Sequence, residues 1–136
     1  MMRRLFIAAA CCAAIACHAA PAQNVKESGM LVRIAEIEVF PQHLSEYLTL
    51  ANEVDRASMN KESGVICLFP MHVEGKPEQI RIVEVYRDAE AYAAHLKTEH
   101  FLKYKTSTQH MVKDLKLITT KPLDPAAMPL IFGKMR

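Results

Sequence analysis

The sequence has little cysteine, little glycine and no long stretch of basic residues. Three of its four cysteines, Cys11, Cys12 and Cys17, lie near the amino terminus, and only Cys67 follows them. The chain beyond Cys17 therefore cannot form an internal disulfide, and a lone thiol such as Cys67 is usually buried on a strand. None of the four glycines belongs to a glycine-rich dinucleotide motif, so no motif supports a flavin or nicotinamide cofactor.

The amino-terminal residues have the order of an export signal. Arg3 and Arg4 precede the uncharged run from Leu5 to Cys17, and Ala20-Pro21-Ala22 then supplies the small residues at which signal peptidase cleaves. This apolar run is too short and too rich in alanine for a membrane span of about 20 residues. We predict a signal peptide over residues 1–22, a polar linker over residues 23–29 and a periplasmic or secreted protein.

Two other export routes remain open. Arg3-Arg4-Leu5-Phe6 resembles a twin-arginine signal, and Ala14-Ile15-Ala16-Cys17 resembles a lipobox in which Cys17 would carry a lipid. Cleavage after Ala22 would remove two of the 17 basic residues and none of the 15 acidic ones, which leaves a neutral body. A neutral body without a basic run predicts no nucleic-acid partner. Its length is that of one domain with a modest core.

The hydrophobic periodicity predicts an α+β domain over residues 30–121, with a proline-rich apolar tail over residues 122–136. Asp88 and Thr98 are good helix caps, and Thr98 should divide the second helical region. The element order β-α-β-β-α-β is that of the ferredoxin-like fold. The expected elements are a strand at Met30–Phe40, a helix from Pro41 to about Gly64, strands at Val65–Val73 and Gln79–Arg87 joined by a turn at Glu74–Pro77, helices after Asp88 and from Glu99 to about Lys113, and a strand at Leu115–Thr120.

A sheet with helices on one face leaves its other face to be covered by another layer. A second copy of the chain is the economical cover, so we predict a homodimer. Along the third strand, period-two alternation places Glu84 and Tyr86 on the same face as Ile80 and Ile82. We predict that this face is the one that closes between the two copies.

Three stretches resemble the antibiotic biosynthesis monooxygenase domain family, including its quinol monooxygenase branch. They are ESGVICLF at residues 62–69, IVEVYRDAEAYAAH at residues 82–95 and TEHF at residues 98–101. The resemblance covers about residues 30–121 and implies a dimeric α+β barrel. The sequence departs from the usual pattern at Ser63 and Glu99, where many members have proline, and at Tyr86, where they often have tryptophan.

Some relatives in this family degrade haem, and the resemblance argues against that reaction here. A gapless alignment places the essential asparagine of that branch at Ala35, its tryptophan at His95 and its iron-ligating histidine at Lys105. None of the three residue types is present, and the chain has no tryptophan at all. We therefore expect no haem and no other cofactor.

His95 is the candidate catalytic residue. It shares a helical stripe with Ala91 and Tyr92 that should face the sheet, and imidazole titrates near neutral pH, which suits a general base. A satisfied core histidine is the alternative, and the resemblance favours function. Because His95 and His100 are five residues apart, they do not have the spacing of a metal-binding pair along one helix, and we expect no metal site. The candidate substrate-binding residues are Glu84, Tyr86, Tyr92, His100 and Phe101.

Three of these candidates, Glu84, His100 and Tyr92, also have purely structural interpretations. Glu84 would be desolvated on a buried face and would need a donor, so it could instead form a salt bridge between strands or subunits. His100 could simply close the helix break after Thr98 against the core. His43, His72 and His110 have no partners that the sequence reveals. Tyr47, Tyr92 and Tyr104 are more typical of a core than of a cofactor stack, and this pattern favours a structural interpretation.

These residues predict an exported, cofactor-independent monooxygenase that acts on a quinol or a similar small electron-rich aromatic. Such chemistry requires a dry pocket, a base and orientation of the substrate. Two alternatives remain open: a dimer that binds a small hydrophobic ligand without turnover, and an isomerase of small carbonyl compounds. Oxygen uptake distinguishes the monooxygenase from both.

Overall fold

The computed structural model describes residues 29–135, and the signal peptide expected at residues 1–22 lies outside them. The strands form one antiparallel sheet in the order β2-β3-β1-β4. This is the ferredoxin-like α+β fold that the sequence predicts. The elements are β1 (Leu31–Val39), the 3-10 helix η1 (Pro41–His43), α1 (Leu44–Lys61), β2 (Val65–Val73), β3 (Lys76–Tyr86), α2 (Ala89–His95), α3 (Glu99–Thr108), β4 (Val112–Thr120) and α4 (Ala127–Gly133).

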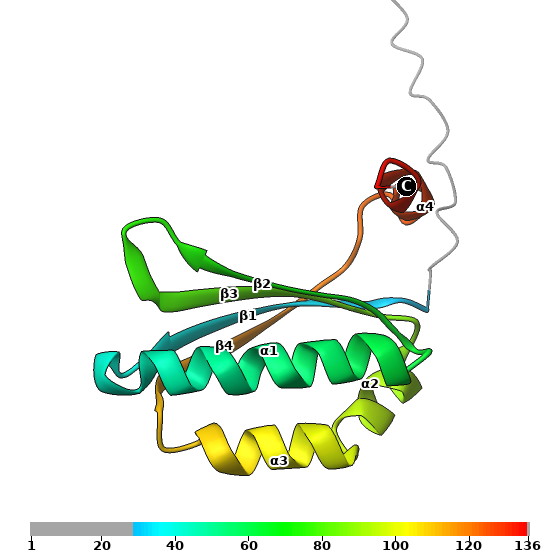
Figure 1. Ribbon diagram of the computed structural model, residues 1–136. Coiled ribbons are helices and arrows are strands. Elements are labelled where there is room, and N and C mark those ends of the chain that lie inside the picture. The colour runs from blue at the N-terminus through cyan, green and yellow to red at the C-terminus, as the bar shows by residue number, and fades with distance from the viewer. Residues whose placement is uncertain (1–28, 136) are drawn as a thin grey trace, which may run out of the picture.

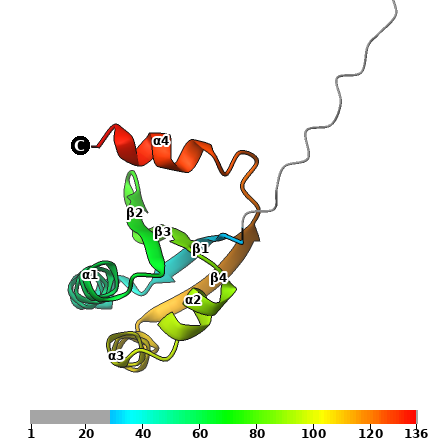
Figure 2. The same cartoon turned by 90° about the vertical axis from the view of Figure 1, so that its right-hand side faces the viewer.

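The helices lie on both sides of this sheet. Helices α1, α2 and α3 cover one face, and the short α4 lies on the opposite side (Figures 1 and 2). We call the first side the helix face and the other side the open face. None of the described helices is long and apolar enough to cross a membrane.

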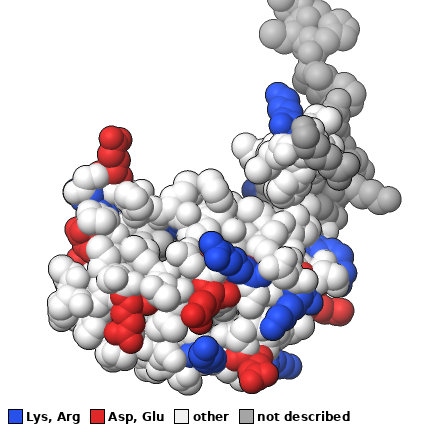
Figure 3. All heavy atoms as spheres, in the orientation of Figure 1, with Lys and Arg blue, Asp and Glu red and all other residues white. Residues whose placement is uncertain are grey.

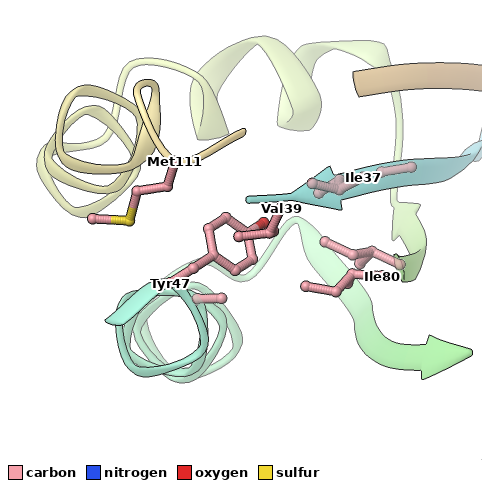
Figure 4. Packing of buried hydrophobic residues seen from close by; sticks show 8 residues of the cluster. Ile37, Val39, Tyr47, Ile80 and Met111 are labelled. Atoms are coloured by element: carbon pink, nitrogen blue, oxygen red, sulfur yellow. The ribbon is translucent and has the colours of Figure 1, made fainter. Parts of the chain in front are cut away.

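The helix face holds the main hydrophobic core. Tyr47 from α1 is fully buried against Val39 of β1, and Met111 closes one end of the cluster (Figure 4). Ile37 and Ile80 contribute from the two central strands, with exposed fractions of 6% and 3%. Burial of each such side chain contributes about 1.5–3 kcal/mol to folding. This core holds α1 against the sheet at one end of the helix face. The polar residues described below lie at the other end.

The two predicted caps set the course of the chain between β3 and α3. The Asp88 carboxylate accepts a hydrogen bond from the backbone N–H of Ala91 at 2.7 Å and starts α2. The Thr98 hydroxyl accepts from the N–H of Phe101 at 3.3 Å, starts α3, and donates to the carbonyl of His95 at 2.9 Å. The helical region is therefore broken at Thr98, as predicted. The break turns the end of α2 toward the beginning of α3.

Gly64 allows α2 to lie close to the turn that follows α1. A Cβ atom at this position would be 2.5 Å from the Cβ of Ala91, which is closer than real side-chain atoms approach. The backbone N–H of Arg87 also donates to the carbonyl of Gly64 at 2.9 Å. This close packing brings the residues at the end of α1 beside α2.

Three predicted boundaries were wrong. Helix α3 ends at Thr108 instead of near Lys113, and β4 begins at Val112 instead of Leu115. The extra strand residues pair with the end of β1, and the Lys113 ammonium donates to the Glu38 carboxylate at 2.6 Å. Pairing with β1 therefore outweighs the helical periodicity in this segment. Strand β3 also begins earlier than expected, at Lys76, because a two-residue turn suffices when Gly75 adopts a positive φ of 73°.

The face predicted for Glu84 and Tyr86 was also wrong. Alternation along β3 does place these residues with Ile80 and Ile82, but Ile80 and Ile82 pack against Tyr47 of α1. Glu84 and Tyr86 therefore lie on the helix face and not on the open face, where a second copy could close the sheet. Period-two alternation shows which residues share a face, but it does not show which face the helices cover.

The open face carries apolar residues that stay accessible in the single chain. Phe69 and Met71 on β2 are 58% and 40% exposed, and Cys67 beside them is only partly buried. Leu130 and Ile131 of α4 are also exposed, at 70% and 54%. Charged residues also lie on this face, since Glu36 pairs with Arg81 across β1 and β3 and their side chains form a salt bridge at 3.7 Å. Figure 3, in the orientation of Figure 1, shows acidic and basic side chains mixed over the visible surface. The open face thus carries an exposed apolar patch on β2 beside charged residues.

Candidate functional site

A cavity of about 660 Å³ lies between the sheet and helices α1, α2 and α3. Its volume is within the usual range for a small-molecule site, about 300–1,000 Å³. Most of the accessible wall is apolar, with Ala35 and Ile37 from β1, Leu68 from β2 and Phe101 from α3 among the lining residues. The polar lining residues include Asp55, Glu84, Tyr86, Tyr104 and His95.

His95, Glu62 and His100 form a hydrogen-bonded group at one end of this cavity. Nδ1 of His95 lies 3.0 and 3.2 Å from the two carboxylate oxygens of Glu62. Nε2 of His100 lies 2.6 Å from Oε1 of the same carboxylate. We call these three residues the Glu62 cluster. His95 lines the cavity, whereas Glu62 and His100 lie outside its lining.

Three separate elements bring the Glu62 cluster together. Glu62 is the C-cap residue directly after α1, His95 ends α2, and His100 lies in the first turn of α3. The close approach of Gly64 to Ala91 brings Glu62 beside His95. The break at Thr98 turns His100 toward both residues. The expectation that His95 and His100 would not come together was therefore wrong, because spacing along one continuous helix does not describe a broken one. His100 contacts Glu62 and does more than close the break.

Sequence reasoning did not identify Glu62 as a functional residue. It is the first residue of the ESGVICLF stretch, which was used only for the family resemblance. The available signal was weak, because it consisted of one carboxylate two residues before Gly64, near the end of an amphipathic helix. Only the packing of α2 against this turn shows that the carboxylate faces two imidazoles.

The Glu62 carboxylate is held in its ionised form. Burial opposes its ionisation, but hydrogen bonds from His100 and His95 outweigh burial and lower the pKa of Glu62 below its ordinary value. An ionised carboxylate only accepts hydrogen bonds, so both ring nitrogens must be donors. His95 therefore carries a proton on Nδ1. In its neutral form it then has a free lone pair on Nε2, the usual arrangement of an imidazole general base.

Aromatic rings hold the His95 imidazole in place. Its ring centroid lies 4.6 Å from that of Phe101 and 5.5 Å from that of Tyr86. Tyr86 in turn contacts Tyr92 at 5.1 Å. The His95 side chain is only 5% exposed. The sequence-derived candidates Tyr86, Tyr92 and Phe101 thus lie in the cavity wall together with His95.

A second polar group lies in the cavity wall. Tyr86 donates its hydroxyl hydrogen to Glu84 at 3.1 Å, and burial raises the pKa of Glu84 despite this bond. Burial, followed by the nearby charge of Glu84, raises the pKa of Asp55 to about 6. Oδ2 of Asp55 is buried and has no hydrogen-bond partner among residues 29–135. Asp55 was not identified from the sequence, and Glu84 forms no salt bridge with any described residue.

Tyr47 and Tyr104 support the cavity from the side of α1 and α3. Their hydroxyl oxygens lie 2.6 Å apart. Tyr47 is fully buried in the core, as its structural interpretation requires, whereas Tyr104 also reaches the cavity lining. This bond links α1 and α3, two of the three helices that cover the cavity.

Comparison with known proteins agrees with the fold. The family model described as antibiotic biosynthesis monooxygenase matches residues 30–107. A candidate antibiotic biosynthesis monooxygenase from Bacteroides thetaiotaomicron is 38% identical, with a TM-score of 0.70, over 71% of this chain and 91% of that one. No curated protein matches the chain.

Two further solved structures extend the comparison. A candidate monooxygenase from Lactobacillus acidophilus is 26% identical, with a TM-score of 0.67, over 68% of this chain but only 44% of its own. A candidate antibiotic biosynthesis monooxygenase from Nitrosomonas europaea is 19% identical, with a TM-score of 0.67, over 72% of this chain and 94% of that one. This structure shares the fold. The family model covers more than half of the sequence, and the chain belongs to the antibiotic biosynthesis monooxygenase family.

Proposed function

We propose that this protein is a cofactor-independent monooxygenase of a quinol or a similar small electron-rich aromatic, with His95 as its general base. The observation that carries this proposal is a buried imidazole in the wall of an apolar cavity, held through Nδ1 by an ionised carboxylate. Membership of the monooxygenase family supports the reaction class.

The reaction begins with proton transfer from a substrate hydroxyl to Nε2 of His95. The resulting anion is a strong enough reductant to react with dioxygen directly. Overall, a quinol and dioxygen give a hydroxyquinone and water. One oxygen atom replaces a ring C–H hydrogen as a hydroxyl group, the two quinol hydroxyls become carbonyls, and the second oxygen atom leaves as water. The protein itself undergoes no net oxidation or reduction.

The site favours this proton transfer in two ways. The Glu62 carboxylate stabilises the imidazolium that forms on His95, as an acidic residue does for histidine in a catalytic triad. The apolar walls, including Ile37 and Phe101, keep water from the anion and from its reaction with oxygen. General-base catalysis of this kind is typically worth about 10²–10⁴-fold in rate.

Oxygen uptake with a series of naphthoquinols and anthraquinols tests the proposal. His95→Gln should lower the rate by about 10²–10⁴-fold, because glutamine cannot accept a proton at neutral pH. Glu62→Gln should lower kcat by about 10²-fold or more, since an amide does not stabilise the imidazolium. His72→Gln, on an exposed part of β2, is the matched control and should retain the wild-type rate.

Two outcomes would contradict the proposal. Full activity in His95→Gln would remove the base from the mechanism. Tight binding of a quinol by the wild-type protein without oxygen uptake would favour a non-catalytic binding protein instead.

We also propose that two copies associate through the open face of the sheet. Phe69 and Met71 are exposed there, and a two-fold axis would bury the same patch on both copies. Light scattering should give about twice the monomer mass, and Phe69→Glu should give a folded monomer. A wild-type monomer at micromolar concentration would refute this arrangement.

The proposed location is outside the cytoplasm, after cleavage following Ala22. The sequence order of basic residues, apolar run and small-residue site supports it. Amino-terminal sequencing of the protein from the exported fraction should begin at Gln23. An intact Met1 or a lipid on Cys17 would exclude simple cleavage.

A further inference from the structure

We infer that the Glu62 cluster is a binding site for a divalent transition-metal cation such as Zn²⁺, and that the bound cation switches His95 from a proton acceptor to a proton donor at the cavity. Two imidazole nitrogens and one carboxylate are a ligand set that such cations favour. The donor atoms of Glu62, His95 and His100 all lie within 4.8 Å of one another.

The distances suit a cation with little rearrangement. Zn²⁺ binds nitrogen and oxygen at about 2.0–2.2 Å, so neighbouring ligand atoms in a tetrahedral site lie about 3.2–3.6 Å apart. Nδ1 of His95 is 3.0 Å and Nε2 of His100 is 2.6 Å from Oε1 of Glu62. To reach this separation from Oε1 of Glu62, Nε2 of His100 would move outward by about 0.6–1 Å from its present 2.6 Å.

The burial of the three side chains indicates how the cation reaches the site. The exposed fraction rises from 5% at His95 through 11% at Glu62 to 18% at His100. Solvent therefore reaches the cluster from the side of His100. The His95 ring is packed against Phe101 at 4.6 Å, so it forms the fixed wall of the site, and a preorganised ligand costs less to order on binding.

The cation would lie behind His95 with respect to the substrate. His95 lines the cavity, whereas the other two ligands do not. Nδ1 of His95 would bind the cation, and its opposite ring nitrogen, Nε2, would face the cavity. The site is therefore placed to control His95 and not to contact a molecule in the cavity.

Cation binding and base catalysis require opposite tautomers of His95. The nitrogen that now donates to Glu62 would have to offer its lone pair to the cation. A neutral imidazole would then carry its proton on Nε2, which can donate a hydrogen bond but cannot accept a proton. Cation binding stands independently of the proposed function, whereas inhibition by the cation rests on it.

Calorimetric titration of the metal-free protein with Zn²⁺ tests the binding site. We expect one Zn²⁺ per chain. Glu62→Gln or His100→Gln should weaken Zn²⁺ binding at least about 100-fold. Removal of a ligand should lower the metal affinity at least as much as removal of a residue that only orients a ligand. His110→Gln is the matched control, because His43 and His110 form a separate histidine pair with ring centroids 5.2 Å apart. Loss of binding in His110→Gln with unchanged binding in the other two variants would overturn the assignment.

Nitrogen-15 NMR of the wild-type imidazoles tests the switch without any substitution. Without Zn²⁺, the His95 proton should be on Nδ1, and with Zn²⁺ it should be on Nε2. An unchanged His95 tautomer at saturating Zn²⁺ would refute the switch, and this result does not depend on whether a variant folds.

Activity separates this inference from the proposed function. We expect Zn²⁺ to inhibit quinol-dependent oxygen uptake with an inhibition constant equal to its dissociation constant. Zn²⁺ binding at the Glu62 cluster without any oxygen uptake would refute the proposed function and leave the cation site intact. Normal oxygen uptake that saturating Zn²⁺ does not inhibit would refute the switch alone.

Discussion

Replacing Asp55 by asparagine should stabilise the folded protein at neutral and alkaline pH. Burial and the charge of Glu84 raise the pKa of Asp55 from its ordinary value of 3.8 to about 6. A carboxyl group whose pKa is higher in the folded state binds its proton more tightly there. Ionisation of Asp55 therefore destabilises the fold as the pH rises, and the neutral amide of asparagine avoids that cost.

The magnitude follows from the difference between the two pKa values. Each pKa unit corresponds to about 1.4 kcal/mol, so the rise from 3.8 to about 6 gives at most about 3 kcal/mol. The destabilisation caused by the ionised Asp55 is absent below about pH 4, increases between about pH 4 and 6, and is complete above about pH 6. Asp55→Asn should thus gain up to about 3 kcal/mol over the wild type at pH 8 and almost nothing at pH 3.5.

Urea unfolding at pH 3.5 and at pH 8 measures this difference. Titrating groups that do not interact with Asp55 affect the wild type and the variant alike, so their contributions cancel when the two are compared, whereas relief of the repulsion between Asp55 and Glu84 is part of the expected gain. Glu46→Gln, on the exposed part of α1, is the matched control and should show no such change with pH. If the stability difference between Asp55→Asn and the wild type is the same at both pH values, the buried charge is not a source of instability.

Two further substitutions test the packing around the site. Gly64→Ala should destabilise the fold by about 1–3 kcal/mol, because the added methyl group would overlap Ala91. Thermal or urea unfolding measures this change, and unchanged stability would refute the close contact. Tyr47→Phe should lower the free energy of unfolding by about 1 kcal/mol in the same assay, because it removes the 2.6 Å hydrogen bond to Tyr104. Thr49→Val, on an exposed turn of α1, is the control for the loss of a hydroxyl group.

Local sequence signals were sufficient for most of the fold. Caps such as Asp88 and Thr98 act within three residues of the chain, and alternation along a strand depends only on its own pleat. These features could be predicted because the physical cause and the residues that show it are adjacent in the sequence. The end of α3 was missed because strand pairing with β1, which is distant in the sequence, decides where β4 begins.

The candidate site depends on contacts that no local pattern records. His95 was identified because it lies on an inward-facing helical stripe, but its partner Glu62 precedes it by 33 positions. The approach of these two residues requires Gly64 to pack on Ala91, and the position of His100 requires the break at Thr98. A histidine that faces a core can therefore be found by periodicity, whereas the group that orients it requires the three-dimensional structure.

Isotope labelling with ¹⁸O₂ tests the central proposal, base-catalysed oxygenation at His95, most directly. The wild-type protein should place one ¹⁸O atom in the quinone product and release the other as labelled water, at a rate that falls by about 10²–10⁴-fold in His95→Gln. A product that contains no ¹⁸O, or equal incorporation rates for the wild type and His95→Gln, would contradict the proposed function.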